Sequence, residues 1–559
     1  MKKIYFFLLF TLFSTFSFAQ TIKGKWLFES ILFEQNTTGE NLKPIAKSDF
    51  MLINNDGSFN YELSEIKLNA SGNWKLSENM LSFHYNQPAD TIRKYEITLT
   101  ETNLVLNENG INFSFKKEEE VSPLTRSGFS FNNLARGLLG IFTLILIAFA
   151  FSRNRKGIDW QLVWKGLLIQ IVFAILILKV PFIQNGFEWL SSIFVTILGF
   201  TREGSLFLFG GLIEDINSFG FIFAFQVLPT ILFFSALTSL LFYYGILQKV
   251  VYGFAFFMKK VMSLSGSESL AAAGNIFLGQ TESPLLIKPY IDKMTMSELL
   301  CLMAGGMATI AGGVLAAYIG FLGGSDPVQQ LFFAKHLLAA SVMSAPASVI
   351  AAKILLPETE KVNEDMSISE EQIGTNALEA ISIGTAQGLK LAVNVGAMLL
   401  VFIAFIAMTN YLLKDFIGDF TGINSWVVSI TNGQYDGFTL QFILGYTLAP
   451  LTWLMGVCKE DIILVGQLLG EKTILNEFVA YVSLGELKAS GKLFEEKSII
   501  IATYILCGFA NFASIGIQIG GIGALAPKRT KDLSKLAILA LIAGTLASLY
   551  TAVIVGMIL

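Results

Sequence analysis

The chain has 559 residues, of which 53% are hydrophobic and only 15% are charged, and its formal net charge is −4. A soluble protein would carry about a quarter of charged residues, so the composition predicts a membrane protein with many transmembrane segments. The small negative charge, without a basic stripe, gives no support for nucleic-acid binding. Two histidines and three cysteines without paired spacing leave little material for a histidine-based metal site, a zinc site or a disulfide framework.

The first twenty residues have the pattern of a secretory signal peptide. Lys2 and Lys3 form a basic start, residues 4–16 form a short apolar core, and residues 17–19 resemble a cleavage site. The alternative is a first transmembrane helix, but the apolar core is short and a polar sequence follows it. We therefore interpret residues 1–20 as a signal peptide.

Residues 21–118 change to short runs of alternating apolar and polar residues, separated by turn-forming sequences. Roughly eight such runs predict short strands in a small antiparallel barrel or sandwich. Gly24-Lys25-Trp26 and Gly72-Asn73-Trp74 resemble the Gly-x-Trp marks of lipocalin-like domains. A closed barrel could bind a small ligand or serve only as a structural cap, and the sequence leaves both open. Residues 117–133 contain Lys, Glu, Ser, Pro and Asn, and residues 119–133 are interpreted as a linker.

From Leu134 onward the chain is a series of apolar segments, each close to the ~20 residues that cross a bilayer. Segments 265–290 and 461–485 are interrupted by polar residues and do not fit as simple spans. A surface helix is expected near 247–260, and the region near 417–457 is of mixed composition. The eight predicted spans are 135–151, 160–181, 219–246, 297–322, 331–355, 385–413, 497–522 and 534–557.

Residues 274–289 are the most informative of these interrupted segments. Four polar residues fall within two helical turns, and Gly279 and Pro284 interrupt any helix through them. A carboxylate such as Glu282 is costly at the bilayer midplane, and non-helical backbone at that depth must be buried in protein or line water. We interpret the segment as a re-entrant hairpin whose tip faces a polar ligand. A loop at the membrane surface is the alternative, but apolar runs lie on both sides.

The distribution of basic residues predicts the orientation of the spans. Clusters near Arg153, Lys259 and Lys528 follow the first, third and seventh spans. All three lie on the cytoplasmic side if the N-terminus is outside, which is also what a cleaved signal peptide would require. The acidic stretch from Glu358 to Glu371 is then expected to be a cytoplasmic loop.

The two halves of the membrane part show a similar pattern. Each half has an interrupted hairpin with a glutamate, Glu282 or Glu477, followed by a span with a break, near 308–313 or 513–516. The count of basic residues places the two hairpins on opposite sides of the membrane, so the repeat is inverted. Paired interrupted segments of this kind indicate a transporter with a binding site near the midplane.

Three motifs in this region resemble the concentrative nucleoside transporters: Gly279-Gln280-Thr281-Glu282-Ser283-Pro284, Asn476-Glu477-Phe478-Val479-Ala480-Tyr481 and Gly508-Phe509-Ala510-Asn511-Phe512-Ala513-Ser514-Ile515-Gly516. The resemblance does not cover the N-terminal β domain. It implies a homotrimer with eight spans, two opposed hairpins and alternating access by a moving transport domain. The membrane domain would cover 134–559, with N-terminal spans in 134–215, a gate and hairpin-one region in 216–325 and a C-terminal region with hairpin two in 326–559.

The resemblance also implies a set of substrate contacts. Amides and carboxylates suit a nucleoside, which is uncharged but rich in donors and acceptors, because each unpaired polar group in a dry site costs about 1–3 kcal/mol. No phosphate-binding cation is in the set, so nucleotides should be excluded. Without the motifs, Asn511, Val314 and Phe509 would be interpreted as packing residues. The implied contacts are Gln280, Thr281 and Glu282 with the nucleobase, Val314 packing on it, Glu477, Asn511 and Ser514 with the ribose, and Phe509 lining the same pocket.

Sodium-coupled members of the family bind the ion between the tip of hairpin one and the break in span four. The matching positions here are Asn275, the carbonyls of Leu278 and Ile310, and the hydroxyl of Thr309, where a serine is expected. An all-oxygen set suits a hard cation. Proton-coupled members lack the full set, so we favour sodium and keep the proton as the alternative. No other cofactor is expected.

The predicted function is therefore a cation-coupled symporter that imports nucleosides across the bacterial inner membrane, with a periplasmic β domain. A channel would need a continuous polar pore, whereas the polar residues collect at two hairpins and two breaks. An enzyme would need a nucleophile–base pair or a metal cluster, and we expect none. A receptor for a small polar ligand could use the β domain but would need a signalling domain, and this chain ends at Leu559 within a predicted span.

Overall fold

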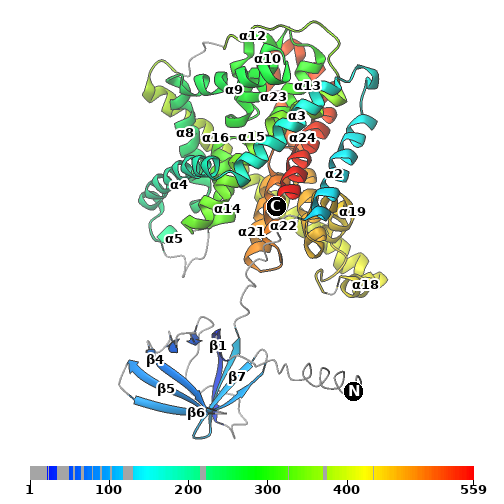
Figure 1. Cartoon of the computed structure of the whole chain (residues 1–559). Helices are drawn as coiled ribbons and strands as arrows, with labels where there is room; N and C mark the ends of the chain where they lie inside the picture. Colours follow the sequence, from blue (N-terminus) through cyan, green and yellow to red (C-terminus); the bar gives the residue numbers. More distant parts are fainter. Residues whose placement is uncertain are drawn as a thin grey trace, which may run out of the picture. The chain divides into compact units, whose positions relative to one another are not determined.

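The chain divides into two compact units, Met1–Pro123 and Leu124–Leu559, and each is described by itself (Figure 1). The predicted signal peptide, 1–20, and most of the predicted linker, 119–133, lie outside the described residues. The computed structural model describes residues 22, 24–33, 49–53, 57–63, 68–77, 80–87, 91–100, 103–117, 130–214, 222–324, 326–368, 374–431 and 433–559.

The N-terminal unit is a closed barrel of eight antiparallel strands in sequential order. The barrel closes because β1 pairs with β8 as well as with β2, so that Trp26 lies opposite Met51 on one side and Lys117 on the other. The sequence allowed a barrel or a sandwich, and the structure is a barrel. Its strands are β1 (Gly24–Phe33), β2 (Phe50–Ile53), β3 (Ser58–Leu63), β4 (Leu68–Ser77), β5 (Met80–Gln87), β6 (Thr91–Leu99), β7 (Asn103–Glu108) and β8 (Ile111–Lys117).

Both Gly-x-Trp motifs have a physical role in this barrel. Trp26 is fully buried, and its indole Nε1 donates a hydrogen bond to the carbonyl of Ile22 at 2.8 Å. Gly72 lies where the backbone of β5 comes very close to β4, because a Cβ there would be 1.9 Å from the carbonyl oxygen of His84. Only glycine fits such a close backbone approach.

The membrane unit is helical and contains eight helices long and apolar enough to cross a membrane among the described residues. Seven of them coincide with predicted spans, and the eighth is α4. The first part of the unit contains α2 (Phe131–Ala150), α3 (Trp160–Lys179), α4 (Pro181–Phe209), α5 (Gly211–Glu214), α7 (Phe223–Gln226), α8 (Leu228–Tyr243) and α9 (Ile246–Met262). Four further helices of the later part are α15 (Pro327–Leu355), α16 (Ala377–Asn410), α19 (Leu440–Leu454) and α24 (Thr530–Ile558). The π-helix η3 (Tyr411–Gly418) and the short helices α17 (Asp419–Thr421) and α18 (Ile423–Ile430) follow α16.

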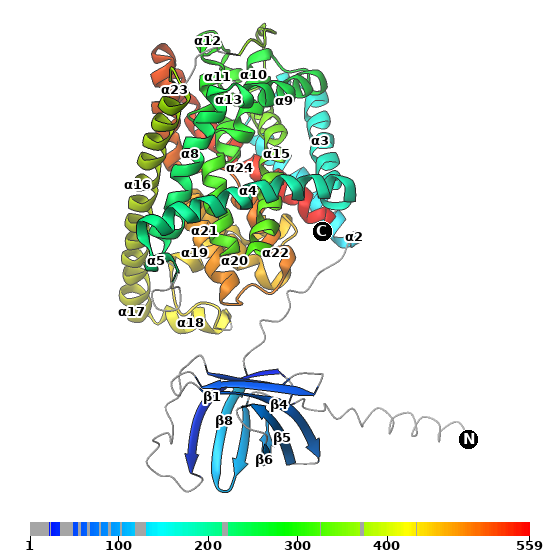
Figure 2. The same cartoon turned by 90° about the vertical axis from the view of Figure 1, so that its left-hand side faces the viewer.

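Helix α4 was not predicted from the sequence. It has 29 residues, and Figure 2 shows it crossing the face of the bundle instead of running alongside α3. Charged residues interrupt its apolar run, and one of them, Glu188, forms an ion pair of 2.9 Å with Lys335 of α15. A helix that lies across the bundle does not need an uninterrupted apolar stretch, which is the signal used to predict a span.

The two predicted hairpins are present and opposed. Figure 2 shows α10–α12 at one end of the bundle and α20–α21 at the other, and the labelled helices α10, α12 and α21 lie in the same way in Figure 1. In hairpin one, α10 ends before Gly279 and a short helix begins at Ser283, so the polar tip is non-helical. The hairpins consist of α10 (Gly266–Phe277), α11 (Ser283–Leu286) and α12 (Lys288–Ile291), and of α20 (Ile462–Ile474) and α21 (Glu477–Ala489).

Each hairpin is followed by a helix with a break. The first break separates α13 (Met296–Ala308) from α14 (Gly312–Gly323), where it was predicted. The second was predicted at 513–516, but it separates α22 (Glu496–Leu506) from α23 (Phe512–Leu525). The backbone turns earlier because Gly508 adopts a φ of +101° and because the side chain of Asn511 caps α23. Residues 513–516 therefore begin α23.

Candidate functional site

The tips of both hairpins and both helix breaks meet around one cavity of about 210 Å³. The structure brings to this cavity all eight residues that the sequence predicted as substrate contacts, although they come from four separate segments. The residues that line it are Gln280, Thr281, Glu282, Val314, Glu477, Phe509, Asn511 and Ser514, together with neighbours in the same segments and four residues of α16.

Gln280 at the tip of hairpin one leaves one polar atom available to a ligand. Its Nε2 donates a hydrogen bond to Ser514 Oγ at 3.2 Å, which joins hairpin one to the start of α23. Its Oε1 is buried and has no hydrogen-bond partner among the described residues. An unpaired buried oxygen costs free energy, so a donor supplied by a ligand would stabilise this arrangement.

Glu282 and Thr281 complete the tip. Glu282 Oε2 accepts a hydrogen bond from the backbone N–H of Gly279 at 3.0 Å and so closes the turn on itself. The methyl group of Thr281 faces Gly521 of α23, since a Cβ at that glycine would lie 2.8 Å from Thr281 Cγ2. The carboxylate of Glu282 is thus a structural part of the tip as well as a wall of the cavity.

Glu477 lies opposite, at the start of α21. It is 4% exposed, and Asn511 Nδ2 donates a hydrogen bond of 2.5 Å to its Oε2. Asn476 and Asn511 cap α21 and α23 through bonds of 2.9 Å to the amides of Val479 and Ser514. Both helices therefore begin at the cavity, and the positive end of the α21 dipole favours a carboxylate in its first turn.

A packed group of aromatic rings joins α14 to the first turns of α21, which begins at Glu477. Tyr318 of α14 stacks on Tyr481 at a centroid distance of 4.1 Å and meets Phe478 edge to face at 5.3 Å. Tyr318 and Tyr481 are fully buried. Because these contacts join α14 to α21, a shift of hairpin two would be transmitted directly to the helix that carries Val314.

One wall of the cavity was missed by the sequence analysis. Leu391, Asn394, Val395 and Met398 of α16 all line it. Three of them are apolar and look like ordinary packing residues of a span. Asn394 is the signal that could have been noticed, because a polar residue within a 34-residue apolar helix commonly faces a cavity or another helix.

The four predicted ion ligands lie in hairpin one and at the break between α13 and α14, which approach each other, since a Cβ at Gly279 would lie 3.3 Å from Ala311 Cβ. Asn275 is 1% exposed, and its Nδ2 lies 3.5 Å from the carbonyl of Leu302. Its Oδ1 is buried without a hydrogen-bond partner in the described part of the chain. Leu278 caps the end of α10, and Thr309 and Ile310 lie in the break between α13 and α14.

These residues fit a hard cation by their chemistry. Thr309 Oγ1 donates to the carbonyl of Gly305 at 2.9 Å, which leaves its lone pairs available for coordination. Gly305 permits the approach of hairpin one, because a Cβ there would lie 2.5 Å from Asn275 Nδ2. Carbonyl, amide and hydroxyl oxygens are the ligands that hard cations prefer, and the unpaired Oδ1 of Asn275 supports that use.

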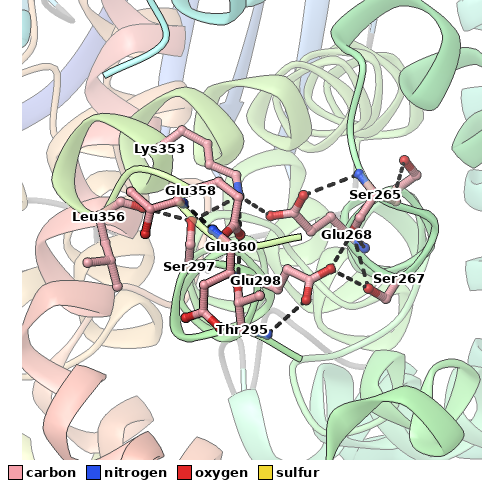
Figure 3. A network of polar contacts seen from close by, with 12 residues as sticks. Ser265, Ser267, Glu268, Thr295, Ser297, Glu298, Lys353, Leu356, Glu358 and Glu360 are labelled. Atoms are coloured by element: carbon pink, nitrogen blue, oxygen red, sulfur yellow. Dashed lines mark hydrogen bonds and ion pairs between the residues drawn. The ribbon is translucent and has the colours of Figure 1, made fainter. Parts of the chain in front are cut away.

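A separate network of charged residues anchors the base of hairpin one (Figure 3). Lys353 of α15 forms an ion pair with Glu268 of α10 and another, of 3.5 Å, with Glu358. Glu298 of α13 accepts hydrogen bonds from Ser265 and Ser267, at 2.6 and 3.0 Å. The network joins α10, α13 and α15, so these helices are expected to move as one body.

The barrel contains a cavity of its own, of about 270 Å³, lined mostly by aromatic and aliphatic side chains. The hydroxyls of Tyr85 and Tyr95 lie 3.2 Å apart, and burial raises the pKa of Tyr85. Arg93 and Glu108 form an ion pair of 3.3 Å at the same cavity. The barrel therefore has room for a small molecule, although a structural role explains its packed rings equally well.

Comparisons with known proteins assign both units to families. Three family models match the membrane unit: the N-terminus of Na+ dependent nucleoside transporters (residues 139–212), a nucleoside-recognition region (224–325) and the C-terminus of Na+ dependent nucleoside transporters (336–556). Residues 22–106 match a lipocalin-like domain. Both matches confirm resemblances noted in the sequence.

Individual relatives are similar over the membrane unit. An uncharacterized transporter of Haemophilus influenzae is 41% identical over 424 residues, covering 75% of this chain and 96% of that protein. Solute carrier family 28 member 3 of Eptatretus stoutii is 41% identical over 432 residues, covering 75% of this chain and 59% of that protein. Sodium/nucleoside cotransporter 1 of Rattus norvegicus is 39% identical over 436 residues, covering 75% and 62%.

Solved structures of one transporter, CNTnw, share the fold. Its inward-facing, substrate-bound state aligns with a TM-score of 0.69 and 37% identity, over 76% of this chain and 98% of that chain. A variant of the same protein in an outward-facing state aligns with the same score and identity, over 77% and 99%.

Proposed function

Because the chain belongs to the concentrative nucleoside transporter family, we propose that it is a sodium–nucleoside symporter that imports nucleosides by alternating access. It is a multi-pass membrane transporter and not an enzyme. The observation that best supports the proposal is the single cavity formed by two opposed hairpin tips and two helix breaks.

The chemistry of this cavity suits an uncharged, polar substrate. Gln280 Oε1 is an unpaired acceptor on one side, and the carboxylate of Glu477, oriented by Asn511, is a charged acceptor on the other. We assign the nucleobase to the side of Gln280, Thr281, Glu282 and Val314. Ribose hydroxyls donate well to a carboxylate, so we assign the sugar to Glu477, Asn511 and Ser514, with Phe509 closing the pocket.

Nucleotides are not expected to be substrates. Among the described residues that line the cavity there is no Lys or Arg to neutralise a phosphate. A phosphate would instead face the carboxylates of Glu282 and Glu477, and repulsion between like charges in a poorly solvated site is strong.

Sodium is proposed as the coupling ion, with the proton as the alternative. Asn275 Oδ1, Thr309 Oγ1 and the carbonyls of Leu278 and Ile310 would hold the ion. Because Leu278 directly precedes the tip, an ion at this site would order Gln280 and Glu282 for the substrate. No proton-accepting group is needed for this coupling.

Uptake of a radiolabelled nucleoside into proteoliposomes tests the proposed sodium coupling. Sodium coupling predicts accumulation under an inward sodium gradient, and uptake that ignores sodium but follows a proton gradient would establish the alternative.

The proposed topology places the β domain (21–118), after a cleaved signal peptide (1–20), in the periplasm of a bacterial plasma-membrane protein. The linker 119–133 would lead into the membrane domain, 134–559, which we propose forms a homotrimer by analogy with the family. The basic clusters near Arg153, Lys259 and Lys528 support this orientation. A reporter enzyme fused after residue 120 should be active only in the periplasm, and cytoplasmic activity would reverse the assignment.

A further inference from the structure

Lys472 in hairpin two is a buried cation that binds neutral oxygens. Its side chain is fully buried in α20. The ammonium donates to the carbonyl of Ile505 at 2.9 Å, to the carbonyl of Cys507 at 3.3 Å and to Ser548 Oγ at 3.0 Å. A charge buried in this way is expensive inside a membrane protein and is commonly functional.

Its position in the chain matches that of Asn275 in the other half. Asn275 lies three residues before Leu278, the residue that caps the end of α10. Lys472 lies three residues before Leu475, which caps the end of α20 with the same backbone hydrogen bond, from its N–H to the carbonyl four residues earlier. Both side chains also donate to a backbone carbonyl of the broken helix that follows, Leu302 in α13 and Ile505 in α22.

The surroundings of the two residues match as well. The residue that caps the end of the broken helix is Thr309 after α13 and Cys507 after α22, each at its break. Two 29-residue helices pack against the broken helices: α15 against α13, and α24 against α22 as well as against α13. Each contributes a serine near the site. Ser548 binds the ammonium, and Ser348 lies near Asn275, because a Cβ at Gly305 would be 2.5 Å from Asn275 Nδ2 and 3.7 Å from Ser348 Oγ.

The two halves thus stabilise the carbonyls at their helix breaks in different ways. A helix break frees backbone carbonyls that need a donor or a cation. In the first half a neutral amide with an unpaired oxygen is present, and our proposed function places sodium there. In the second half the ammonium of Lys472 already meets the freed carbonyl of Cys507.

We propose that Lys472 is a tethered cation, which takes in hairpin two the place that sodium takes in hairpin one. It links α20 to the break before α23 and so positions Glu477 and Asn511 for the substrate whether or not sodium is bound. This inference rests on the proposed sodium site. Because the ammonium is covalently attached, it returns with the protein in each cycle and adds nothing to the charge transported.

The test is nucleoside binding to purified full-length protein, measured by calorimetry at several sodium concentrations. Lys472→Met removes the charge but keeps the apolar stem. We expect it to weaken nucleoside binding about tenfold or more at saturating sodium, as the loss of a charged hydrogen bond predicts. Lys472→Asn recreates the amide found at position 275. We expect it to regain affinity at high sodium, with a dependence on sodium concentration that steepens from about first to about second order.

The matched control is Lys488→Met. Lys488 also lies in hairpin two and donates to neutral oxygens, the carbonyl of Leu322 and Gln329 Oε1, both at 2.9 Å, but it is remote from the break. The Lys488→Met variant should bind nucleoside with the same affinity as the wild type. If the Lys472 variants do not fold, Ser548→Ala keeps the charge and removes one acceptor, and nucleoside binding should weaken several-fold while sodium stabilisation of the substrate-free protein is unchanged.

The outcomes separate this inference from the proposed function. If wild-type binding ignores sodium, the sodium symporter itself is wrong. If the wild type responds to sodium but Lys472→Met, or Ser548→Ala in its place, binds nucleoside normally, only the tethered cation is wrong. If nucleoside binding to the Lys472→Asn variant stayed first order in sodium concentration, the tethered-cation proposal would likewise be wrong.

Discussion

Asn511 Nδ2 and Glu477 Oε2 are joined by a hydrogen bond of 2.5 Å, between the start of α23 and the start of α21. The same Asn511 side chain uses its oxygen to cap α23. The amide therefore cannot turn over without losing both bonds. This fixes the direction in which the carboxylate presents its remaining lone pairs, and it is the basis of the first prediction.

Glu477→Gln should weaken nucleoside affinity by about ten- to a hundredfold, since a hydrogen bond to a charged group contributes roughly 1.5–3 kcal/mol. The variant should fold, because the glutamine oxygen can still accept from Asn511. Glu282→Gln should have an effect of similar size on affinity. Calorimetric titration with nucleoside measures both. Wild-type affinity in the two variants would remove these carboxylates from the binding site.

The second prediction concerns the ion. Asn275→Ala or Thr309→Ala should raise the sodium concentration needed for half-maximal uptake, with a smaller effect at saturating sodium, because each removes one oxygen ligand. Thr545→Ala is a matched control, since Thr545 makes the same kind of bond to a carbonyl four residues earlier, that of Leu541 at 2.9 Å. Equal sodium dependence in all three variants would place the ion elsewhere.

If sodium is carried inward with an uncharged nucleoside, uptake should be electrogenic. One cation gains about 2.3 kcal/mol per 100 mV of membrane potential. A potassium–valinomycin potential, negative inside, should therefore increase initial uptake in proteoliposomes at fixed sodium. Uptake that is indifferent to the potential would contradict a net movement of charge.

Much of the site could be predicted from sequence because its polar residues stand out against an apolar background. Gln280, Glu282 and Glu477 are costly in a membrane unless they face a cavity, so their position is informative. The wall from α16 could not be predicted in this way, since Leu391, Val395 and Met398 differ in no local property from residues that face lipid.

The fold, like the site, could be predicted from the sequence only in part. The barrel strands and seven spans follow from periodicity and length. Helix α4 was missed because it crosses the bundle, and its charged Glu188 is accommodated by Lys335 of α15, a contact between residues far apart in sequence. The second break was misplaced by several residues because the small residues at 513–516 suggested a bend, whereas the backbone conformation of Gly508 decides its position.

The fourth prediction concerns the β domain. A chain that lacks residues 21–118 but keeps the signal sequence should insert and transport nucleosides, because every residue assigned to the site lies beyond Leu134 and the barrel has its own core around Trp26. Initial uptake rate per inserted molecule is the measurement. A correctly inserted truncation without uptake would show that the β domain takes part in transport.

The final prediction concerns Gly508, where the two helix breaks touch. A Cβ at this position would lie 2.5 Å from the carbonyl oxygen of Ala308, the last residue of α13. Its φ of +101° is also a conformation that residues with a side chain rarely adopt. Gly508→Ala should therefore lower the melting temperature of the purified protein and impair uptake, because it forces apart the two breaks that carry the ion and substrate residues.

Gly516 provides the matched control from the same motif. It lies within α23, and nothing is found within 4 Å of where its Cβ would be. Alanine is favoured over glycine inside a helix by roughly 1 kcal/mol, so Gly516→Ala should leave the melting temperature unchanged or slightly raised, with normal uptake. If Gly508→Ala were as well tolerated as Gly516→Ala, the close contact between the breaks would not be needed for transport.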